Sequence, residues 1–157
     1  MVKVKVPATT ANFGPGFDCM GAALSLHNYV EMDFSPTIQI SVSGEGKDEI
    51  DKGEGNLIYK AAQRVLKELG IRQSLRIHQE NHIPLARGLG SSAACVAAGM
   101  MAAHRLTGEK LSIKRIVELA TQMEGHPDNV VPALLGGFCI CLSRGEEVLY
   151  RRFPFFE

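Results

Sequence analysis

The chain has 157 residues, of which 45% are apolar and 22% are charged. This length and composition suit one soluble globular domain with a real core. The 17 basic and 17 acidic residues balance, so no basic field indicates a general binder of nucleic acid or of a membrane surface. No apolar run approaches the roughly 20 residues that cross a bilayer.

Four cysteines are present, namely Cys19, Cys95, Cys139 and Cys141. No pair has the spacing of a zinc site, and Cys139 and Cys141 alternate on one face of a predicted strand. We therefore expect reduced, mostly buried thiols in a cytoplasmic protein. The first residues alternate valine and lysine, which indicates a strand rather than a signal peptide.

The first third of the chain is predicted to form strands. The valine and lysine alternation predicts a strand over residues 2–6, and a turn rich in glycine and proline follows over 7–21. Apolar and alternating segments predict further strands over 22–34 and 37–43. A charged loop over 44–55 leads into the helical part.

Helices and short strands then alternate. Asn56 is a plausible N-cap for a helix over 57–69, and Gly70 sits where a helix-ending glycine belongs. Ser112 caps another predicted helix. The remaining predicted elements are a strand over 75–79, helices over 91–106 and 113–123, a polar turn over 125–132, and strands over 134–142 and 147–153.

This order of elements predicts an α+β domain with a mixed β-sheet and helices on one face. The chain ends in Arg151–Glu157, with three phenylalanines and no polar tail. Such an end looks like a cut through a longer polypeptide.

A glycine-rich loop carries the strongest chemical signal. It consists of Pro84, Leu85, Ala86, Arg87, Gly88, Leu89, Gly90, Ser91, Ser92, Ala93 and Ala94. Gly88 and Gly90 allow a close backbone approach to an anion, and a helix beginning at Ser91 directs free N–H groups and its positive dipole end at the loop. This predicts a phosphate site, although a glycine turn that caps an alanine-rich core helix is the alternative. The loop is neither a Walker A loop nor the dinucleotide fingerprint G-x-G-x-x-G.

A second polar cluster lies in residues 7–18, where Thr9, Thr10, Asn12 and Asp18 are short polar residues around a turn. Such a turn can present hydrogen-bond donors and one carboxylate to a small polar ligand. The alternative is ordinary turn chemistry, since Asn, Asp, Gly and Pro are the usual turn residues.

A third cluster follows a predicted helix, where His126, Asp128 and Asn129 could reach a substrate hydroxyl or phosphate. The alternative is a helix-ending turn with a solvated histidine. Upstream, Glu118 could face the phosphate loop and complete a Mg²⁺ site, because Mg²⁺ prefers one or two carboxylates together with phosphate oxygens. An exposed helix glutamate is the simpler alternative.

Together the three clusters resemble the GHMP kinases, a family that includes galactokinase, homoserine kinase and mevalonate kinase. Residues 84–94 are similar to the family's ATP-binding signature, P-x-x-x-G-L-G-S-S-A-A. The second and third clusters, over 7–18 and 125–133, are most similar to those of the homoserine kinase branch. The resemblance covers essentially the whole chain.

The resemblance implies ATP-dependent phosphorylation of L-homoserine in threonine biosynthesis. It implies that the loop over 84–94 binds ATP, that Ser92 and Glu118 hold Mg²⁺, and that homoserine contacts a further set of residues. That set comprises Asn12, Asp18 and His126 for binding, with Asp128 and Asn129 as the catalytic residues near the reacting hydroxyl. No general base is assigned, since positioning and charge neutralisation can suffice for phosphoryl transfer.

The implied fold is a two-layer lobe shared with some ribosomal proteins, with a left-handed β-α-β connection. Residues 1–157 would form the N-terminal ATP-binding domain, and a C-terminal substrate lobe would be absent. We therefore expect weak or no activity from the fragment alone. Some family members are dimers, so a homodimer is possible.

Two other functions stay open. One is a GHMP kinase that acts on a sugar or isoprenoid alcohol, and the other is a non-catalytic ligand-binding relative. Asp18 and His126 favour an amino-acid substrate, because an ammonium group pairs with a carboxylate. Intact Ser92 and Asp128 argue against a sensor that has lost catalysis.

Overall fold

The computed structural model describes residues 1–154 as six strands and four helices. Their bounds are β1 Val2–Ala11, β2 Met20–Ser35, β3 Gln39–Gly44, α1 Leu57–Glu68, β4 Ser74–Asn81, α2 Ser91–Leu106, α3 Ile113–Glu124, α4 Pro127–Leu135, β5 Phe138–Arg144 and β6 Glu147–Phe153. Phe155, Phe156 and Glu157, on which part of the expectation of a cut chain rests, lie outside the described residues.

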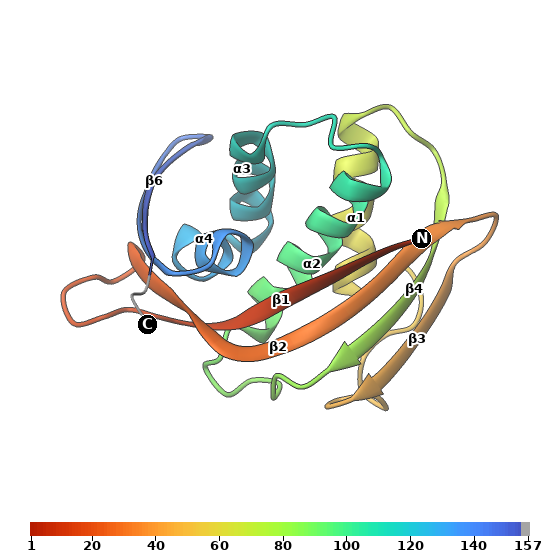
Figure 1. Cartoon of the computed structure of the whole chain (residues 1–157), viewed down its shortest axis with the longest axis horizontal. Coiled ribbons are helices and arrows are strands. Elements are labelled where there is room, and N and C mark those ends of the chain that lie inside the picture. Colours follow the sequence, from red (N-terminus) through yellow and green to blue (C-terminus); the bar gives the residue numbers. More distant parts are fainter. Residues whose placement is uncertain (155–157) are drawn as a thin grey trace.

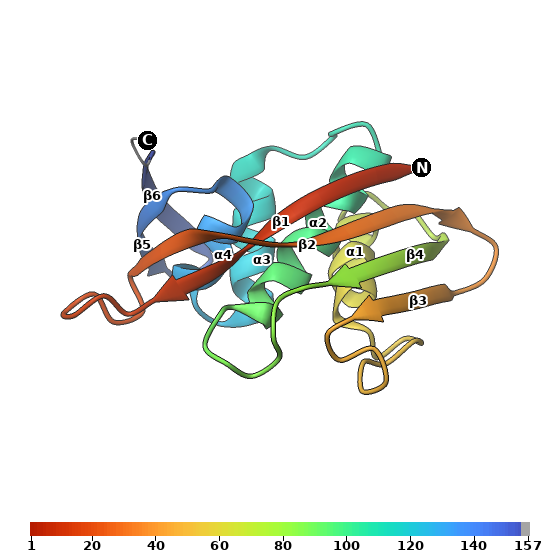
Figure 2. The same ribbon diagram turned by 60° about the horizontal axis from the view of Figure 1, so that its bottom comes forward.

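The strands form one mixed sheet around the long strand β2. β1 runs antiparallel along one edge of β2, while β4 and β5 pair antiparallel with opposite ends of its other edge. β3 pairs parallel with β4, and α1 connects them, which gives a β-α-β unit. The helices all cover one face of the sheet (Figure 1), and the other face is open (Figure 2). The predicted α+β, two-layer architecture is therefore confirmed.

The core lies between the sheet and the helices. Alternation along the strands points one set of apolar residues inward, among them Val4, Val6, Val30, Met32, Leu75 and Ile77. Small residues let α2 lie very close to α1: a Cβ on Gly99 would overlap with the backbone oxygen of Ile58. The alanine-rich sequence of α2 thus sets the depth at which this helix, and the loop before it, sit in the domain.

The predicted helix ends are confirmed by their hydrogen bonds. Asn56 Oδ1 accepts from the backbone N–H of Tyr59 at 3.1 Å. Ser112 Oγ accepts from the N–H of Arg115 at the same distance. Gly70, just after α1, has a φ of +69°.

Two predicted turns are wrong. The turn over 7–21 begins too early, because Pro7–Ala11 continue β1 and pair with β2, with a register shift between Pro7 and Thr9. The turn over 125–132 is instead the start of α4, in which Pro127 occupies a first-turn position where its missing N–H costs nothing. Pro132 lies inside this helix and leaves the carbonyl of Asp128 without its usual helical donor.

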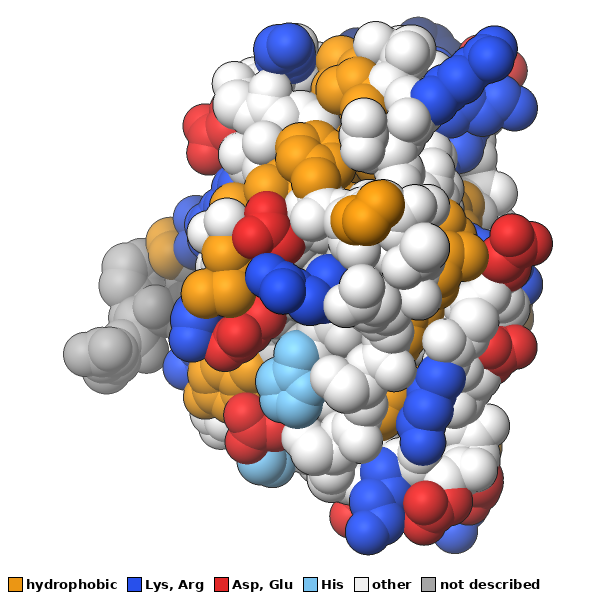
Figure 3. Space-filling view, turned by 90° about the vertical axis from the view of Figure 1, so that its right-hand side faces the viewer, with side chains coloured by type: hydrophobic (Ala, Val, Ile, Leu, Met, Phe, Trp, Pro, Cys, Tyr) orange, Lys and Arg blue, Asp and Glu red, His pale blue; other side chains and the backbone are white. Residues whose placement is uncertain are grey.

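Within the described part of the chain, no helix is long and apolar enough to cross a membrane. Basic and acidic side chains are interspersed on the surface face in Figure 3, in keeping with the balanced charge. All four cysteines are free, and Cys139 and Cys141 are buried on the same face of β5.

Candidate active site

The glycine-rich loop has alternating backbone conformations. Ala86, Gly88 and Gly90 have φ values of +54°, +70° and +62°, whereas Arg87 and Leu89 between them are not in the left-handed region. Alternation of this kind turns successive N–H groups toward one concave side, which is the geometry of an anion-binding nest. Ala86 adopts a conformation that normally favours glycine, so the loop is held in this shape by its surroundings.

The loop ends in the N-terminus of α2. Gly90 is the N-cap and has no side chain to accept a hydrogen bond, and the first helical bond runs from Ala94 N to Gly90 O at 2.8 Å. The N–H groups of Ser91, Ser92 and Ala93 therefore have no acceptor within the helix. They face a cavity of about 220 Å³ that is lined by residues 86–93, Glu124 and Asn129.

Thr9, on β1, fixes the loop from behind. Its backbone N–H donates to Leu89 O at 3.1 Å, and its hydroxyl donates to Asn129 Oδ1 at 2.8 Å. The same hydroxyl fills the space beside Gly90, where a Cβ would overlap with it. Thr9 is fully buried, so it connects β1, the loop and α4 from inside the protein.

The carboxylate beside the loop is Glu124, not Glu118. Ser92 Oγ donates to Glu124 Oε1 at 2.6 Å, whereas Glu118 pairs with Arg115 at 3.2 Å, and Arg115 pairs with Glu68 of α1. The structure therefore does not bring Ser92 and Glu118 together as predicted. Residues 118 and 124 lie about 9 Å apart along the helix axis, and only the later one is level with the start of α2.

A signal for Glu124 was present in the sequence. The short connection over 107–112 makes α2 and α3 antiparallel neighbours, so the end of α3 must lie beside the start of α2. Glu118, at the middle of α3, is too early in the helix to meet this constraint.

Asn12, Asp18 and His126 lie together, at the turn between β1 and β2 and the start of α4. Asn12 Oδ1 accepts from the N–H of Asp18 at 3.0 Å, and His126 Nδ1 lies 3.5 Å from Asp18 Oδ2. Asn12 and Asp18 both have positive φ. The carboxylate of Asp18 and the imidazole of His126 are 42% and 61% exposed, so both are open to a ligand.

Asp128 and Asn129 have different surroundings in the structure. Asn129 lines the loop cavity, while Asp128 is only 4% exposed and is not among the lining residues. Asn129 Nδ2 donates to Asp128 Oδ1 at 3.3 Å. α4 packs so closely on β2 that a Cβ on Gly21 would overlap with the carbonyl oxygen of Asp128. Asp128 is therefore placed to support Asn129 from inside the fold.

A second cavity, of about 410 Å³, lies directly behind the loop, and no sequence pattern indicated it. Apolar groups dominate its wall, which includes Ile50, Leu57, Ile58, Leu85, Ala86 and Cys95, together with Asn56, Gln79, Ser91 and Ser92. Burial raises the pKa of the Cys95 thiol to about 11, so this thiol is neutral. Ala86, Ser91 and Ser92 line both cavities, so the two are adjacent.

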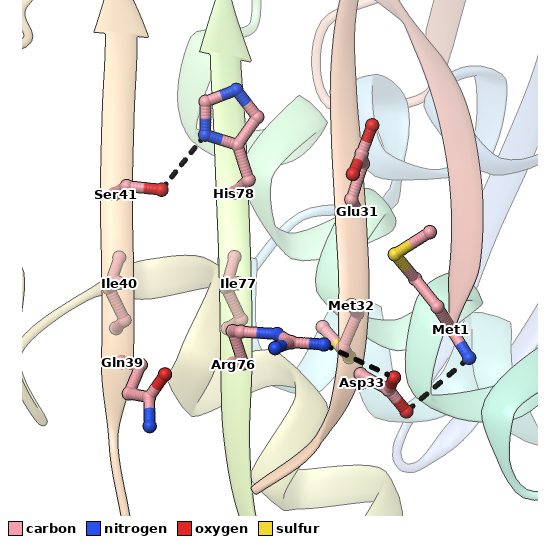
Figure 4. Close-up of a pocket in the computed structure, with 10 residues that line it drawn as sticks. All are labelled: Met1, Glu31, Met32, Asp33, Gln39, Ile40, Ser41, Arg76, Ile77 and His78. Carbon is pink, nitrogen blue, oxygen red and sulfur yellow. Dashed lines mark hydrogen bonds and ion pairs between the residues drawn. The ribbon is translucent and has the colours of Figure 1, made fainter.

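A larger cavity, of about 510 Å³, lies elsewhere, on the open face of the sheet. Figure 4 shows Arg76 and the Met1 amino group directed at Asp33, and Ser41 directed at His78. Asp33 pairs with the Met1 amino group at 3.3 Å and with Arg76 at 3.5 Å, and Ser41 hydrogen bonds to His78 at 2.9 Å. None of the residues predicted to be functional lines it.

Comparison with known proteins defines the class. The family model described as "GHMP kinases N terminal domain" matches residues 56–137, slightly more than half of the chain. The matched segment includes α1, the glycine-rich loop, α2, α3 and α4. The chain therefore belongs to the GHMP kinase family.

Two similar proteins carry the name of one particular kinase of this family. The chain is 47% identical over 154 residues to the homoserine kinase of Caldanaerobacter subterraneus subsp. tengcongensis, which covers 97% of this chain and 49% of that protein. It is 46% identical to the homoserine kinase of Caldicellulosiruptor bescii, over 98% of this chain and 50% of that one. The chain thus spans about half the length of the curated relatives it matches.

The fold of this chain is similar to the folds of solved kinase structures. The homoserine kinase of Cytophaga hutchinsonii is 32% identical and superposes with a TM-score of 0.84, over 98% of this chain and 51% of that one. The mevalonate kinase of Methanococcus jannaschii, at 15% identity and a TM-score of 0.70, shares the fold alone.

Proposed function

We propose that residues 1–157 are the N-terminal, ATP-binding lobe of a homoserine kinase, whose substrate site is completed by a C-terminal lobe. The observation that carries the proposal is the convergence of the open N–H groups of the loop, Glu124 and Asn129 on one cavity. The exposed Asp18–His126 pair lies at the same end of α4. The substrate assignment is supported by the relatives named homoserine kinase at 46–47% identity.

The two adjacent cavities match the two chemically different parts of ATP. The polar cavity suits the phosphates, because backbone N–H groups and the helix dipole favour negative charge there. The apolar cavity behind the loop suits the purine base, which would be buried against Leu57 and Leu85. The shared wall at Ser91 and Ser92 would lie under the ribose and the first phosphate.

Glu124 explains why a Mg²⁺ ion would be needed. A carboxylate beside a triphosphate is repelled by it unless a cation lies between them. The Ser92 hydroxyl and the Glu124 carboxylate are oxygen donors of the kind that Mg²⁺ accepts together with phosphate oxygens and waters. We therefore propose Ser92 and Glu124 as the residues that hold the ion; when bound, it would neutralise charge on the phosphates.

The Asp18–His126 pair suits the amino-acid end of homoserine. The Asp18 carboxylate can pair with the substrate ammonium group. Asn12 holds the turn that presents Asp18, since its amide oxygen accepts the Asp18 N–H. His126 lies against the same carboxylate and would limit the directions from which the ammonium group can approach.

Catalysis by this lobe would depend on positioning. Asn129 faces the phosphate cavity, and Thr9 and Asp128 fix its amide from two sides. An amide cannot accept the hydroxyl proton as a base, but it can orient the homoserine hydroxyl toward the terminal phosphate of ATP. In-line placement and charge neutralisation account for most of the catalysis of phosphoryl transfer. The product would be O-phospho-L-homoserine, an intermediate of threonine biosynthesis in the cytoplasm.

A chimaeric enzyme tests the proposal. Residues 1–157 would replace the matching half of the Caldanaerobacter subterraneus homoserine kinase, and ADP release would be measured with L-homoserine, L-serine, L-threonine, galactose and mevalonate. We expect homoserine to give at least about 100-fold the kcat/KM of the other alcohols, and the isolated chain to give weak or no turnover.

Faster turnover of a sugar or of mevalonate would contradict the substrate assignment. Nucleotide binding without turnover of any alcohol would favour the non-catalytic relative. The unmodified Caldanaerobacter enzyme, assayed in parallel, controls for the C-terminal half.

A further inference from the structure

Two cysteines that are far apart in the sequence, Cys19 and Cys141, lie opposite each other in the fold. β2 pairs antiparallel with β5, and the first pair of this ladder is Met20 with Ile140. The same register, continued by one residue, places Cys19 opposite Cys141. The Cys141 N–H donates to the Cys19 carbonyl oxygen at 2.7 Å, so the two residues form a directly opposed, hydrogen-bonded cross-strand pair.

The side chains of this pair point to the same side of the sheet. Opposed residues of antiparallel strands share a face, and Cys141 is 2% exposed. Gly21, two residues after Cys19, faces α4, because a Cβ there would meet the carbonyl oxygen of Asp128. Burial, with smaller contributions from Cys139, Asp128 and Cys19, raises the pKa of the Cys141 thiol to about 12. The two thiols are therefore close enough to interact, and Cys141 is neutral.

The spacing of this pair suits a disulfide. The Cα atoms of an opposed, hydrogen-bonded pair lie about 5.5 Å apart, inside the disulfide range of about 4.4–6.8 Å. Cys139 lies opposite Gly21, so it is diagonal to Cys19, where Cα atoms are about 7–8 Å apart. Cys139 and Cys141 leave the same strand in parallel, about 7 Å apart. Of the cysteines of β5, only Cys141 is thus placed to bond with Cys19.

We propose that Cys19 and Cys141 are an oxidation site, at which a peroxide joins their two sulfur atoms in a disulfide. Cys19 reacts first, because it is partly exposed whereas Cys141 is buried. Its thiolate attacks hydrogen peroxide: an S–O bond forms, the O–O bond breaks, and the hydroxide that leaves becomes water with the proton of the Cys19 thiol. The product is a sulfenic acid at Cys19.

The second step closes the disulfide. The Cys141 sulfur attacks the Cys19 sulfur, so that an S–S bond forms and the S–O bond breaks. The hydroxide leaves as water with the proton of the Cys141 thiol. In total, the pair of thiols loses two electrons, and these reduce one peroxide molecule to two molecules of water.

The disulfide would act on the turn that carries Asp18, since Cys19 directly follows it. The Cβ atoms of opposed residues are about 4.5–5.5 Å apart, and a disulfide brings them to about 3.8 Å. Cys141 is held inside β5 by its pairing with Tyr150 of β6, so the turn moves instead. With the proposed homoserine site as its basis, the inference is that oxidation displaces Asp18 and weakens the use of homoserine.

The disulfide itself is tested on the 157-residue chain. The chain would be incubated with hydrogen peroxide, its thiols counted and its disulfides mapped by mass spectrometry. We expect the free thiols to fall from four to two, with one intramolecular bond between Cys19 and Cys141, and dithiothreitol to restore all four. Neither Cys19→Ser nor Cys141→Ala should form an intramolecular disulfide. Cys139→Ala is the matched control, because Cys139 lies on the same face of the same strand, and this variant should still form the bond.

Three results would overturn the disulfide. They are a parent chain that keeps four thiols, one that accumulates a sulfinic acid at Cys19, and one whose disulfide joins Cys19 to Cys139 or Cys95. If Cys141→Ala does not fold, Cys19→Ser still tests the pair, because it changes a partly exposed side chain.

The link to Asp18 is tested in the chimaeric kinase. Peroxide should lower kcat/KM for homoserine by about 10-fold or more, leave the dissociation constant of ATP within about 3-fold, and be reversed by dithiothreitol. The chimaera with Cys141→Ala should lose this sensitivity, which controls for cysteines of the C-terminal half. A disulfide that forms without a change in kcat/KM would refute the link. A reduced chimaera without homoserine turnover would refute the proposed function, while the mapping would still decide the disulfide.

Discussion

The cavity on the open face of the sheet is more than twice as large as the one at the glycine-rich loop, about 510 against 220 Å³. In the larger cavity, the charged groups are paired with one another: Asp33 with Arg76 and the Met1 amino group, and Glu31 with Lys3 at 2.6 Å. In the smaller one, backbone N–H groups at the start of α2 lack acceptors within the helix.

Polar groups without a partner in the fold therefore mark a binding site better than cavity volume does. Cross-strand pairs on an open sheet satisfy each other at little cost, because both partners are flexible and solvated. The first N–H groups of a helix cannot be satisfied by their own helix. A fold that places these N–H groups around a concave loop therefore has a preformed anion site. The difference between the two cavities can be tested by substitutions at each.

The largest effect should come from Gly90→Ala. Alanine there has to adopt a φ near +62° and its Cβ overlaps with the Thr9 hydroxyl, so the loop and β1 must move apart. We expect ATP affinity to fall at least about 100-fold and the free energy of unfolding to fall by about 3 kcal/mol. Calorimetry and urea denaturation measure the two.

Gly145→Ala is the control, because Gly145 has nearly the same φ, +63°, and no atoms within 4 Å of an added Cβ. It should cost about 1–2 kcal/mol and leave ATP binding intact. Equal effects of the two substitutions on ATP binding would contradict the role of the contact between Gly90 and Thr9, because Gly145 lies in the turn between β5 and β6, outside the loop.

The next effect concerns Glu124. Glu124→Gln removes the charge beside Ser92 but keeps the shape and a hydrogen-bond acceptor. The increase in ATP affinity on adding Mg²⁺ should therefore shrink by about 10-fold. Glu118→Gln should leave this increase within about 2-fold of the parent, because Glu118 is paired with Arg115. The opposite ranking would restore Glu118 as the metal ligand.

Thr9→Val should have a moderate effect. It keeps the buried volume but removes the hydroxyl that donates to Asn129 Oδ1. We expect a loss of about 1 kcal/mol in the free energy of unfolding and a loss of a few-fold in ATP affinity. Thr10→Val, one residue along the strand, is the control, since the described structure contains no hydrogen bond of the Thr10 side chain. A larger effect at Thr10 would contradict the anchoring role of Thr9.

The smallest effect is expected on the open face of the sheet. Arg76→Ala and Asp33→Ala should each change the free energy of unfolding by less than about 1 kcal/mol, because exposed ion pairs contribute little. ATP binding should stay the same, at low and high salt. A change of more than about 3-fold in ATP affinity would mean that the larger cavity communicates with the loop, and the contrast between the two cavities would no longer hold.

The sequence by itself predicted the architecture and the chemical character of the site. Alternation along β1 and β3, the caps at Asn56 and Ser112, and the glycines before Ser91 are local signals, so each could be interpreted from a few neighbouring residues. The same holds for the phosphate loop, because the start of a helix after a glycine turn produces free N–H groups in any protein.

Which residues come into contact depends on how the helices and strands pack. Local propensity favoured a turn over 125–132, but α4 forms because Pro127 opens a helix well and because Gly21 and β2 offer a surface against which it packs. The packing of α2 against α3 put Glu124 rather than Glu118 beside Ser92. The register between β2 and β5 put Cys19 opposite Cys141. Such pairings depend on the distance between segments far apart in the chain, and that distance is fixed only when the core packs.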